Sequence, residues 1–135
     1  LELAIEWAFD QSPEAVVLFG AIGNRLDHTM ANLALLERGL HSGIDMELVA
    51  GEETVRLVQT ECVLGDARIG DRVSLLPVSL FATVATVGLR FALSGEKLFR
   101  GWARGVSNVV DEVPVRVQVE AGVLALVHAQ ESARG

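Results

Sequence analysis

The stretch Gly20-Ala21-Ile22-Gly23-Asn24-Arg25-Leu26-Asp27-His28 lies between two patterns that predict regular structure. The apolar run Ala15–Phe19 before it predicts a short strand buried on both faces of a parallel sheet. The pattern Thr29–Arg38 after it predicts a helix. Strand, glycine turn, charged residues and helix in this order place a cation, a carboxylate and backbone N–H groups at one edge of a sheet. That edge is where α/β proteins bind ligands.

The segments around this stretch extend the α/β pattern. Leu1–Phe9 has the apolar spacing of an amphipathic helix, and Ser12-Pro13 breaks it. The second helix is expected to end at Gly39 and Gly43. Its apolar residues on one side are Leu26, Met30, Leu33 and Ala34. Helix, strand, glycine turn and helix together are typical of an α/β layer.

Beyond residue 45 the pattern changes to short strands separated by turns. In Val115–Glu120, valines alternate with polar residues, which predicts a strand with one face in water. The expected strands are Met46–Ala50, Thr54–Val58, Glu61–Leu64, Arg72–Leu76, Ala82–Val87, Leu89–Leu93, Val113–Glu120 and Val123–His128. The sequence therefore predicts an α/β unit over residues 1–45 and an antiparallel, jelly-roll-like β-sandwich over residues 46–135. We expect Gln130–Gly135 to be a frayed tail.

Composition excludes several classes of function. The chain has 135 residues and a net charge of -7. It has no cluster of Lys and Arg of the kind that binds nucleic acid. No apolar run approaches the roughly 20 residues that cross a bilayer. Cys62 is the only cysteine, so no intrachain disulfide can form, and a reducing cytoplasm is the simplest compartment. An acidic protein that binds a nucleotide would need a divalent metal between its carboxylates and the phosphates.

The two most suggestive motifs also have simple structural explanations. Gly20–His28 is also explained as a tight strand-to-helix turn in which Asp27 caps the helix and Arg25 lies on the surface. Ser107-Asn108, which follows Gly101 and Gly105, is explained as an ordinary turn, because Ser and Asn bond to their own backbone.

Taken together, four motifs resemble the thiamine pyrophosphokinase family. Gly20–His28 has the family's glycine turn followed by Arg-Leu-Asp-His, and Asn32 stands at the family's Asn position in the next helix. Gly70–Pro77 is similar to its Gly-Asp-x-x-Ser-Leu-Leu-Pro segment. Val87–Leu93 is similar to its Gly-Leu-x-Tyr-x-Leu strand, and Gly105–Asn108 to its Gly-x-Ser-Asn signature. The four occur in the family's order over nearly the whole chain.

The resemblance implies transfer of a pyrophosphoryl group from ATP to the hydroxyl of thiamine, which gives AMP and thiamine diphosphate. It also implies a Rossmann-like nucleotide-binding domain, a thiamine-binding β-sandwich, and a homodimer with thiamine near the interface. Mg²⁺ is the implied cofactor, with ATP as co-substrate. An arginine fork on phosphate and Mg²⁺ on carboxylates suit this chemistry, which depends on positioning and charge neutralisation.

By the same resemblance, Arg25 and Asp27 are the candidate catalytic residues. Asp27 either orients the attacking hydroxyl, accepts its proton or holds metal, and it also borders the thiamine site with Ser107 and Asn108. The nucleotide and phosphate candidates are Gly20, Gly23, Arg25 and His28.

The family's Asp-x-Asp-Ser and Lys-Asp-x-Thr-Asp segments, which supply most Mg²⁺ and ATP carboxylates, do not occur in the chain. Leu1–Phe9 resembles the helix that follows the second segment, so we expect the main metal ligands upstream of Leu1. Two hypotheses follow. The chain is the C-terminal portion of a thiamine pyrophosphokinase, inactive without the missing segment, or it is a non-enzymatic dimeric module that binds thiamine or a similar heterocycle.

Overall fold

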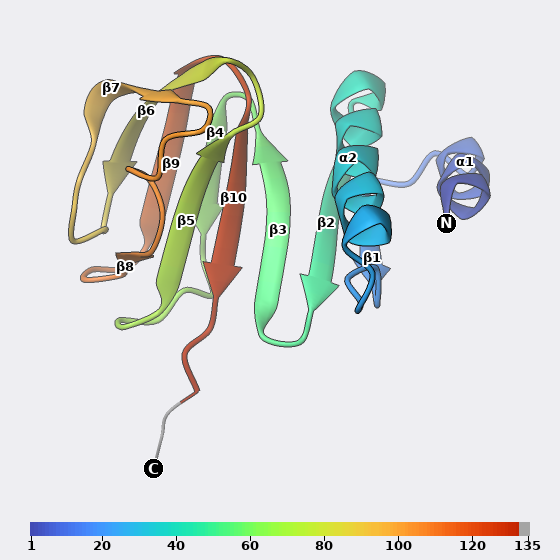
Figure 1. The fold of residues 1–135 in the computed structure, drawn as a ribbon, viewed down its shortest axis with the longest axis horizontal. Coiled ribbons are helices and arrows are strands. Elements are labelled where there is room, and N and C mark those ends of the chain that lie inside the picture. The colour runs from blue at the N-terminus through green and yellow to red at the C-terminus, as the bar shows by residue number, and fades with distance from the viewer. Residues whose placement is uncertain (133–135) are drawn as a thin grey trace. The chain divides into compact units, whose positions relative to one another are not determined.

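The computed structural model describes residues 1–132, and its contacts divide the chain into a first unit, Leu1–Leu57, and a second unit, Val58–Gly135. The first unit holds α1 (Glu2–Asp10), β1 (Ala15–Phe19), α2 (Leu26–Ser42), β2 (Asp45–Ala50) and all but the last residue of β3 (Glu53–Val58) (Figure 1). β1 pairs with β2 in parallel across the α2 crossover, and β2 pairs with β3 in antiparallel fashion. Since parallel pairing ties β2 to β1, the observed division falls later than the predicted one near residue 45.

β1 is not buried on both faces as predicted. Leu18 is buried, but the side chains of Val17 and Phe19 are exposed. Alternate residues of a strand point to opposite faces, and along β1 the face that carries Val17 and Phe19 is exposed. Arg38 joins α2 to α1 through ion pairs to Glu2 at 3.0 Å and Glu6 at 2.9 Å.

The buried side of α2 also differs from the prediction. Leu36 and Gly39 are the buried residues of the helix, whereas Leu26 and Met30 are exposed. Gly39 does not end the helix, because it lies inside α2, where a Cβ would overlap the side chain of Met46. Gly43 is the C-cap, in the left-handed conformation with φ 67°, as the sequence indicated.

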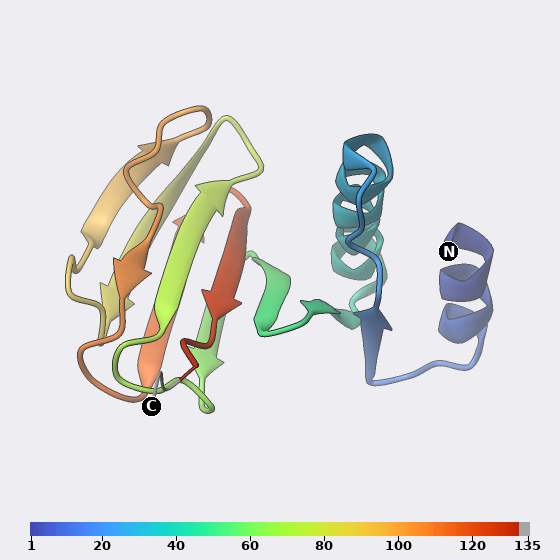
Figure 2. The same cartoon turned by 60° about the horizontal axis from the view of Figure 1, so that its bottom comes forward.

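The second unit consists of strands. They are β4 (Glu61–Leu64), β5 (Arg72–Pro77), β6 (Phe81–Val87), β7 (Ser94–Phe99), β8 (Asn108–Val109), β9 (Val115–Ala121) and β10 (Leu124–Ala129). β10, β5 and β8 are neighbours in one antiparallel sheet, and β4, β9, β6 and β7 form the other. β5 and β10 run side by side in both views (Figures 1 and 2). The predicted class, α/β followed by all-β, is confirmed.

One core joins the two sheets of the second unit. It contains Val73 and Leu75 from β5 together with Val84 from β6 and Val117 from β9. Along β9 the valines are buried and the intervening residues are exposed, as the alternation predicted. Cys62 is partly buried and packs against this core.

Three details of the second unit differ from the prediction. In the expected strand Leu89–Leu93, Leu89 makes only an isolated bridge to Val110. The strand at this point of the chain is β7, Ser94–Phe99. The short strand β8 was not predicted at all. The expected frayed tail is partly ordered, since the backbone N–H of Glu131 donates to Asp71 at 3.1 Å, and residues 133–135 of that tail lie outside the described residues.

Candidate functional site

The glycine turn of the first unit is held by side chains of α2. Gly20 adopts a left-handed φ of 69°, which a residue with a Cβ rarely takes. Asn32 donates from Nδ2 to the carbonyl of Ala21 at 2.8 Å, and the N–H of Gly23 donates to the Thr29 hydroxyl at 3.3 Å. A Cβ on Gly23 would meet nothing within 4 Å, so the backbone there is open to approach by a ligand.

The helix begins three residues before the predicted Thr29. Arg25 is the N-cap, with an extended backbone and no side-chain capping bond, and Leu26 is the first helical residue. Asp27 therefore lies in the first turn and is not the cap. A carboxylate in the first turn interacts favourably with the positive end of the helix dipole.

Arg25 and Asp27 form an exposed ion pair at the start of α2. The guanidinium Nη2 lies 2.7 Å from Asp27 Oδ2, and the two side chains are 70% and 66% exposed. The Arg25 bond, followed by the backbone N–H of His28 at 2.9 Å, holds the pKa of Asp27 below its usual range. An exposed ion pair adds little to stability. Because both side chains are exposed, both groups are available to a ligand.

The Gly105–Asn108 turn of the second unit is fixed on the edge of β5. The N–H of Leu75 donates to the carbonyl of Gly105 at 2.8 Å, and a Cβ on Gly105 would overlap the Leu75 carbonyl oxygen. The N–H of Ser107 donates to the Ser74 hydroxyl at 3.0 Å. Ser107 is exposed, has a left-handed φ of 60°, and its hydroxyl has no hydrogen-bond partner among residues 1–132.

Asn108 is buried, and its amide is used inside the protein. Its Oδ1 accepts the N–H of Phe91 at 3.1 Å and that of Val109 at 2.9 Å, and its Nδ2 donates to the Phe91 carbonyl at 2.9 Å. The Phe91 side chain is 67% exposed. Sequence reasoning did not select Phe91 as a site residue, although it stands at the aromatic position of the Val87–Leu93 motif.

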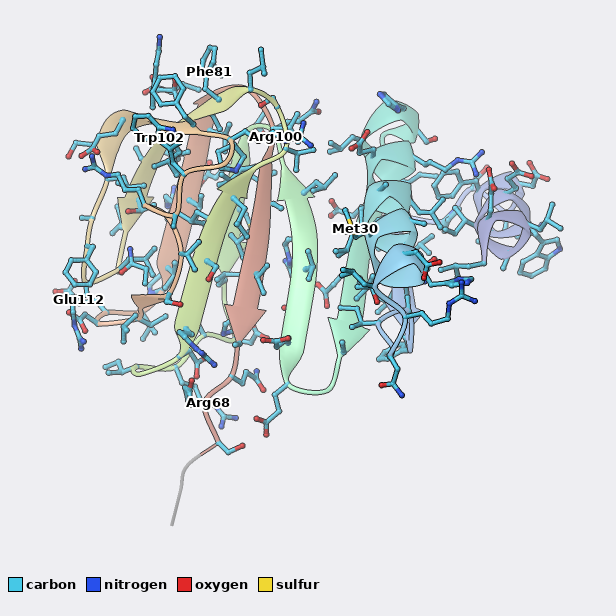
Figure 3. The ribbon with its side chains drawn as sticks, viewed as in Figure 1. Met30, Arg68, Phe81, Arg100, Trp102 and Glu112 are labelled. Carbon is cyan, nitrogen blue, oxygen red and sulfur yellow. The ribbon has the colours of Figure 1, made fainter. Side chains whose placement is uncertain are left out.

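An aromatic cluster lies near this turn in the sequence. The rings of Phe99 and Trp102 are 5.2 Å apart, those of Phe81 and Phe99 are 6.3 Å apart, and the Lys97 amine lies 4.8 Å from the Phe81 ring centre. Phe81 and Trp102 are labelled at the same end of the second unit in Figure 3. Trp102 is 66% exposed and so is not a core residue.

Asp71 and His128 make a buried pair that the sequence did not reveal. Their side chains are both 2% exposed, and His128 Nε2 lies 2.8 Å from Asp71 Oδ2. The backbone N–H groups of Arg68 and Glu131 also donate to this carboxylate. Burial raises the pKa of Asp71, but the hydrogen bonds from His128, Arg68 and Glu131 outweigh it and lower the pKa overall. Asp71 of the Gly70–Pro77 motif is therefore structural.

The described residues do not provide a magnesium site by themselves. Among residues 1–132 no three or more His, Cys, Asp and Glu side chains gather closely enough to hold a metal ion. Asp27 supplies one carboxylate, and one of its oxygens is bonded to Arg25. The structure brings the predicted phosphate-site residues together at one turn of the first unit, and Ser107 with Asn108 at one turn of the second.

Family comparisons match both turns. The family model described as "Thiamin pyrophosphokinase, catalytic domain" matches residues 1–48, and the one described as "Thiamin pyrophosphokinase, vitamin B1 binding domain" matches residues 61–124. The chain belongs to the thiamin pyrophosphokinase family. Within the family assignment, the glycine turn and the Arg25–Asp27 pair fall in the catalytic match, and the Gly105–Asn108 turn falls in the vitamin B1 match.

Individual members of the thiamin pyrophosphokinase family agree with this assignment. Thiamine pyrophosphokinase 1 of Oryza sativa subsp. japonica is 28% identical over 120 residues, which are 85% of this chain and 45% of that protein. The crystal structure of the Bacillus subtilis thiamine pyrophosphokinase has the same fold, with a TM-score of 0.89 at 21% identity. That of the Geobacillus thermodenitrificans enzyme gives 0.84 at 27% identity.

The chain is shorter than these relatives. It covers 62% of the Bacillus subtilis chain and 61% of the Geobacillus chain, while 96% and 98% of its own length is matched. The helices within residues 1–132 include none that is long and apolar enough to cross a membrane.

Proposed function

We propose that this chain carries part of the active site of a thiamine pyrophosphokinase, which converts ATP and thiamine to AMP and thiamine diphosphate. The observation that carries the proposal is that a catalytic-domain match and a vitamin B1-binding match follow each other along one chain. The protein is then a transferase of thiamine diphosphate biosynthesis.

In this reaction the thiamine hydroxyl oxygen forms a bond to the β-phosphorus of ATP. The bond between that phosphorus and the oxygen bridging to the α-phosphate breaks, and the bridging oxygen leaves on AMP. The hydroxyl proton is released. Such transfers depend on orientation and on neutralising phosphate charge more than on covalent chemistry by the protein.

The glycine turn and the start of α2 suit the binding of phosphate. The Arg25 guanidinium is exposed and can form two parallel hydrogen bonds to a phosphate. The backbone at Gly20 and Gly23 is open to approach, and the N-terminus of α2 provides N–H groups and a favourable dipole. The backbone N–H of His28 now bonds to Asp27 and lies in the same first turn.

We assign Asp27 to orienting the attacking hydroxyl. Its lowered pKa keeps the carboxylate ionised at neutral pH, so it accepts a hydrogen bond from the hydroxyl readily and takes up a proton weakly. Its exposure leaves room for the substrate beside Arg25. Full proton abstraction and metal binding are the alternative roles. The metal role has the weaker support, because among residues 1–132 Asp27 belongs to no group of three or more His, Cys, Asp and Glu side chains that could hold a metal ion.

Thiamine is proposed to contact the second unit at the Gly105–Asn108 turn. The Ser107 hydroxyl is exposed and available to a polar atom of the substrate rings. The backbone of Phe91, whose side chain is exposed, is bonded to Asn108, the residue after Ser107. Asn108 supports the site from inside the protein, since its amide is bonded to the backbone of Phe91 and Val109.

We propose Mg²⁺ as the cofactor that accompanies the ATP phosphates, where it would neutralise their charge. The described residues fit no complete site for it, so the roles assigned above do not depend on its position. We also propose a homodimer with thiamine near the interface. The exposed aromatic residues Phe99 and Trp102, with Leu80 at 81% exposure, support an interface on the second unit.

The experiment uses the full protein that contains residues 1–135, with ATP, thiamine and Mg²⁺, and measures AMP and thiamine diphosphate. AMP should form only when thiamine is present. Asp27→Asn should lower kcat/KM by about 100-fold or more, the scale expected for loss of a charged group that positions a reacting hydroxyl. Asp45→Asn is the matched control in the same unit, because Asp45 is exposed at the start of β2. Unchanged turnover in Asp27→Asn would remove Asp27 from the mechanism.

A second candidate function is thiamine binding without turnover. It is favoured by the vitamin B1-binding match to residues 61–124 and by the lack of a metal-binding cluster in residues 1–132. It predicts a calorimetric signal with thiamine, unaffected by ATP and Mg²⁺, and no AMP. Formation of AMP by the full protein would exclude it.

A further inference from the structure

At the edge between β5 and β8, a side chain of β5 holds the backbone just before β8. Arg72 pairs with Val109 and Val73 with Asn108, so the same register would place Ser107 opposite Ser74. At that point the regular ladder stops. There the left-handed Ser107 turns its N–H toward the side-chain hydroxyl of Ser74, to which it donates at 3.0 Å.

Ser107 has a backbone conformation that needs support. Its φ of 60° is left-handed, which is unfavourable for a residue with a Cβ, so its surroundings must fix it. Gly105 before it is bonded to Leu75, and Asn108 after it is buried and bonded to Phe91. Among residues 1–132, Ser107 itself makes one hydrogen bond, the one to Ser74.

Ser74 lies on the outer face of β5, since its neighbours Val73 and Leu75 are both buried. The Ser74 hydroxyl oxygen accepts a hydrogen bond from the Ser107 N–H, and Ser107, with its own hydroxyl, is exposed. We infer that Ser74 is a positioning residue, whose hydroxyl holds Ser107 in the left-handed conformation that presents the Ser107 hydroxyl to thiamine. The inference rests on the proposed role of Ser107 in binding thiamine.

The test compares Ser74→Thr with Ser74→Val in the full protein that contains residues 1–135. The two replacements have nearly the same shape and both favour a strand, but only threonine keeps the hydroxyl. Ser94→Val is the matched control, because Ser94 is an exposed serine at the start of β7 in the other sheet. The measurements are the thiamine Kd by calorimetry and the hydrogen-exchange rates of the Ser107 and Leu75 amides by NMR.

Ser74→Thr and Ser94→Val should bind thiamine within about twofold of the unmodified protein. Ser74→Val should bind about five- to tenfold more weakly, the effect of losing one supporting hydrogen bond. In Ser74→Val the Ser107 amide should exchange at least about tenfold faster, while the Leu75 amide, which bonds to Gly105, keeps its rate.

Three results would overturn the inference. They are equal thiamine affinity of the Thr and Val variants, equal exchange of the Ser107 amide in both, and a rise in Leu75 exchange that matches the rise at Ser107, which would indicate general loosening of the fold. The proposed function fails separately if the unmodified protein binds no thiamine or if Ser107→Ala binds as tightly as the unmodified protein. The exchange comparison then still decides whether Ser74 fixes Ser107.

Discussion

Replacing Asp71 with alanine should destabilise the protein more than any change at an exposed ion pair. The Asp71 carboxylate accepts three hydrogen bonds, from His128 Nε2 at 2.8 Å, Arg68 N–H at 2.9 Å and Glu131 N–H at 3.1 Å. His128 lies in β10, Arg68 in the loop before β5, and Glu131 in the segment after β10. The variant would leave the buried His128 ring without its carboxylate.

The size of the effect follows from the number and burial of these bonds. A hydrogen bond to a charged group contributes about 1.5–3 kcal/mol, and the contributions overlap when one carboxylate serves several donors. Breaking a buried pair by removing one partner costs about 3–5 kcal/mol. We therefore expect Asp71→Ala to lower the free energy of unfolding by about 3–5 kcal/mol, or Tm by roughly 10–20 °C for a chain of this size.

Urea unfolding followed by circular dichroism measures this difference. The matched control is Asp111→Ala, because Asp111 also pairs with a cation, Arg90 at 2.9 Å, but the side chains are 43% and 53% exposed. Exposed pairs contribute about 0–1 kcal/mol. If Asp71→Ala costs no more than Asp111→Ala, the structural role given to the buried pair is wrong.

The same pair predicts a dependence on pH. The pKa of Asp71 is lowered in the folded state, so its ionised form stabilises the protein fully above about pH 4, the ordinary range of an aspartate. This contribution is lost as the pH falls through the lower folded-state value. The difference in unfolding free energy between the unmodified protein and Asp71→Ala should stay constant from pH 7 to 5 and shrink toward pH 2. A difference that grows on acidification would contradict the direction of the shift.

Two further predictions concern the Gly105–Asn108 turn. Gly105→Ala should cost about 1–3 kcal/mol in urea unfolding, because its Cβ would overlap the carbonyl of Leu75, whereas the control Gly65→Ala, with open space around it, should cost less than about 0.5 kcal/mol. Equal effects would remove the close approach as the reason for glycine. Asn108→Ala should cost about 1–3 kcal/mol and speed amide exchange at Phe91, because it removes the Oδ1 and Nδ2 bonds to that residue. Unchanged exchange at Phe91 would show that the amide does not anchor it.

Much of the fold followed from local pattern. The period of two in Val115–Glu120 predicted the buried valines of β9, and the apolar run Ala15–Phe19 predicted β1. Gly43 predicted the end of α2, since a left-handed C-cap is a local backbone requirement. The sequence could not show which faces are covered, so Val17 was predicted to be buried and is exposed.

The sequence by itself determined the class of fold, the family resemblance and the residue types at both turns, because these depend on short-range periodicity and on motif order. Only the tertiary structure decided what each motif residue does. Asp71 became a buried structural carboxylate because β10 brings His128 to it, 57 positions along the chain. Ser107 gained its support from Ser74, 33 positions away, and Asn108 from Phe91, 17 positions away. These contacts arise from strand pairing and chain reversal, which no local pattern specifies.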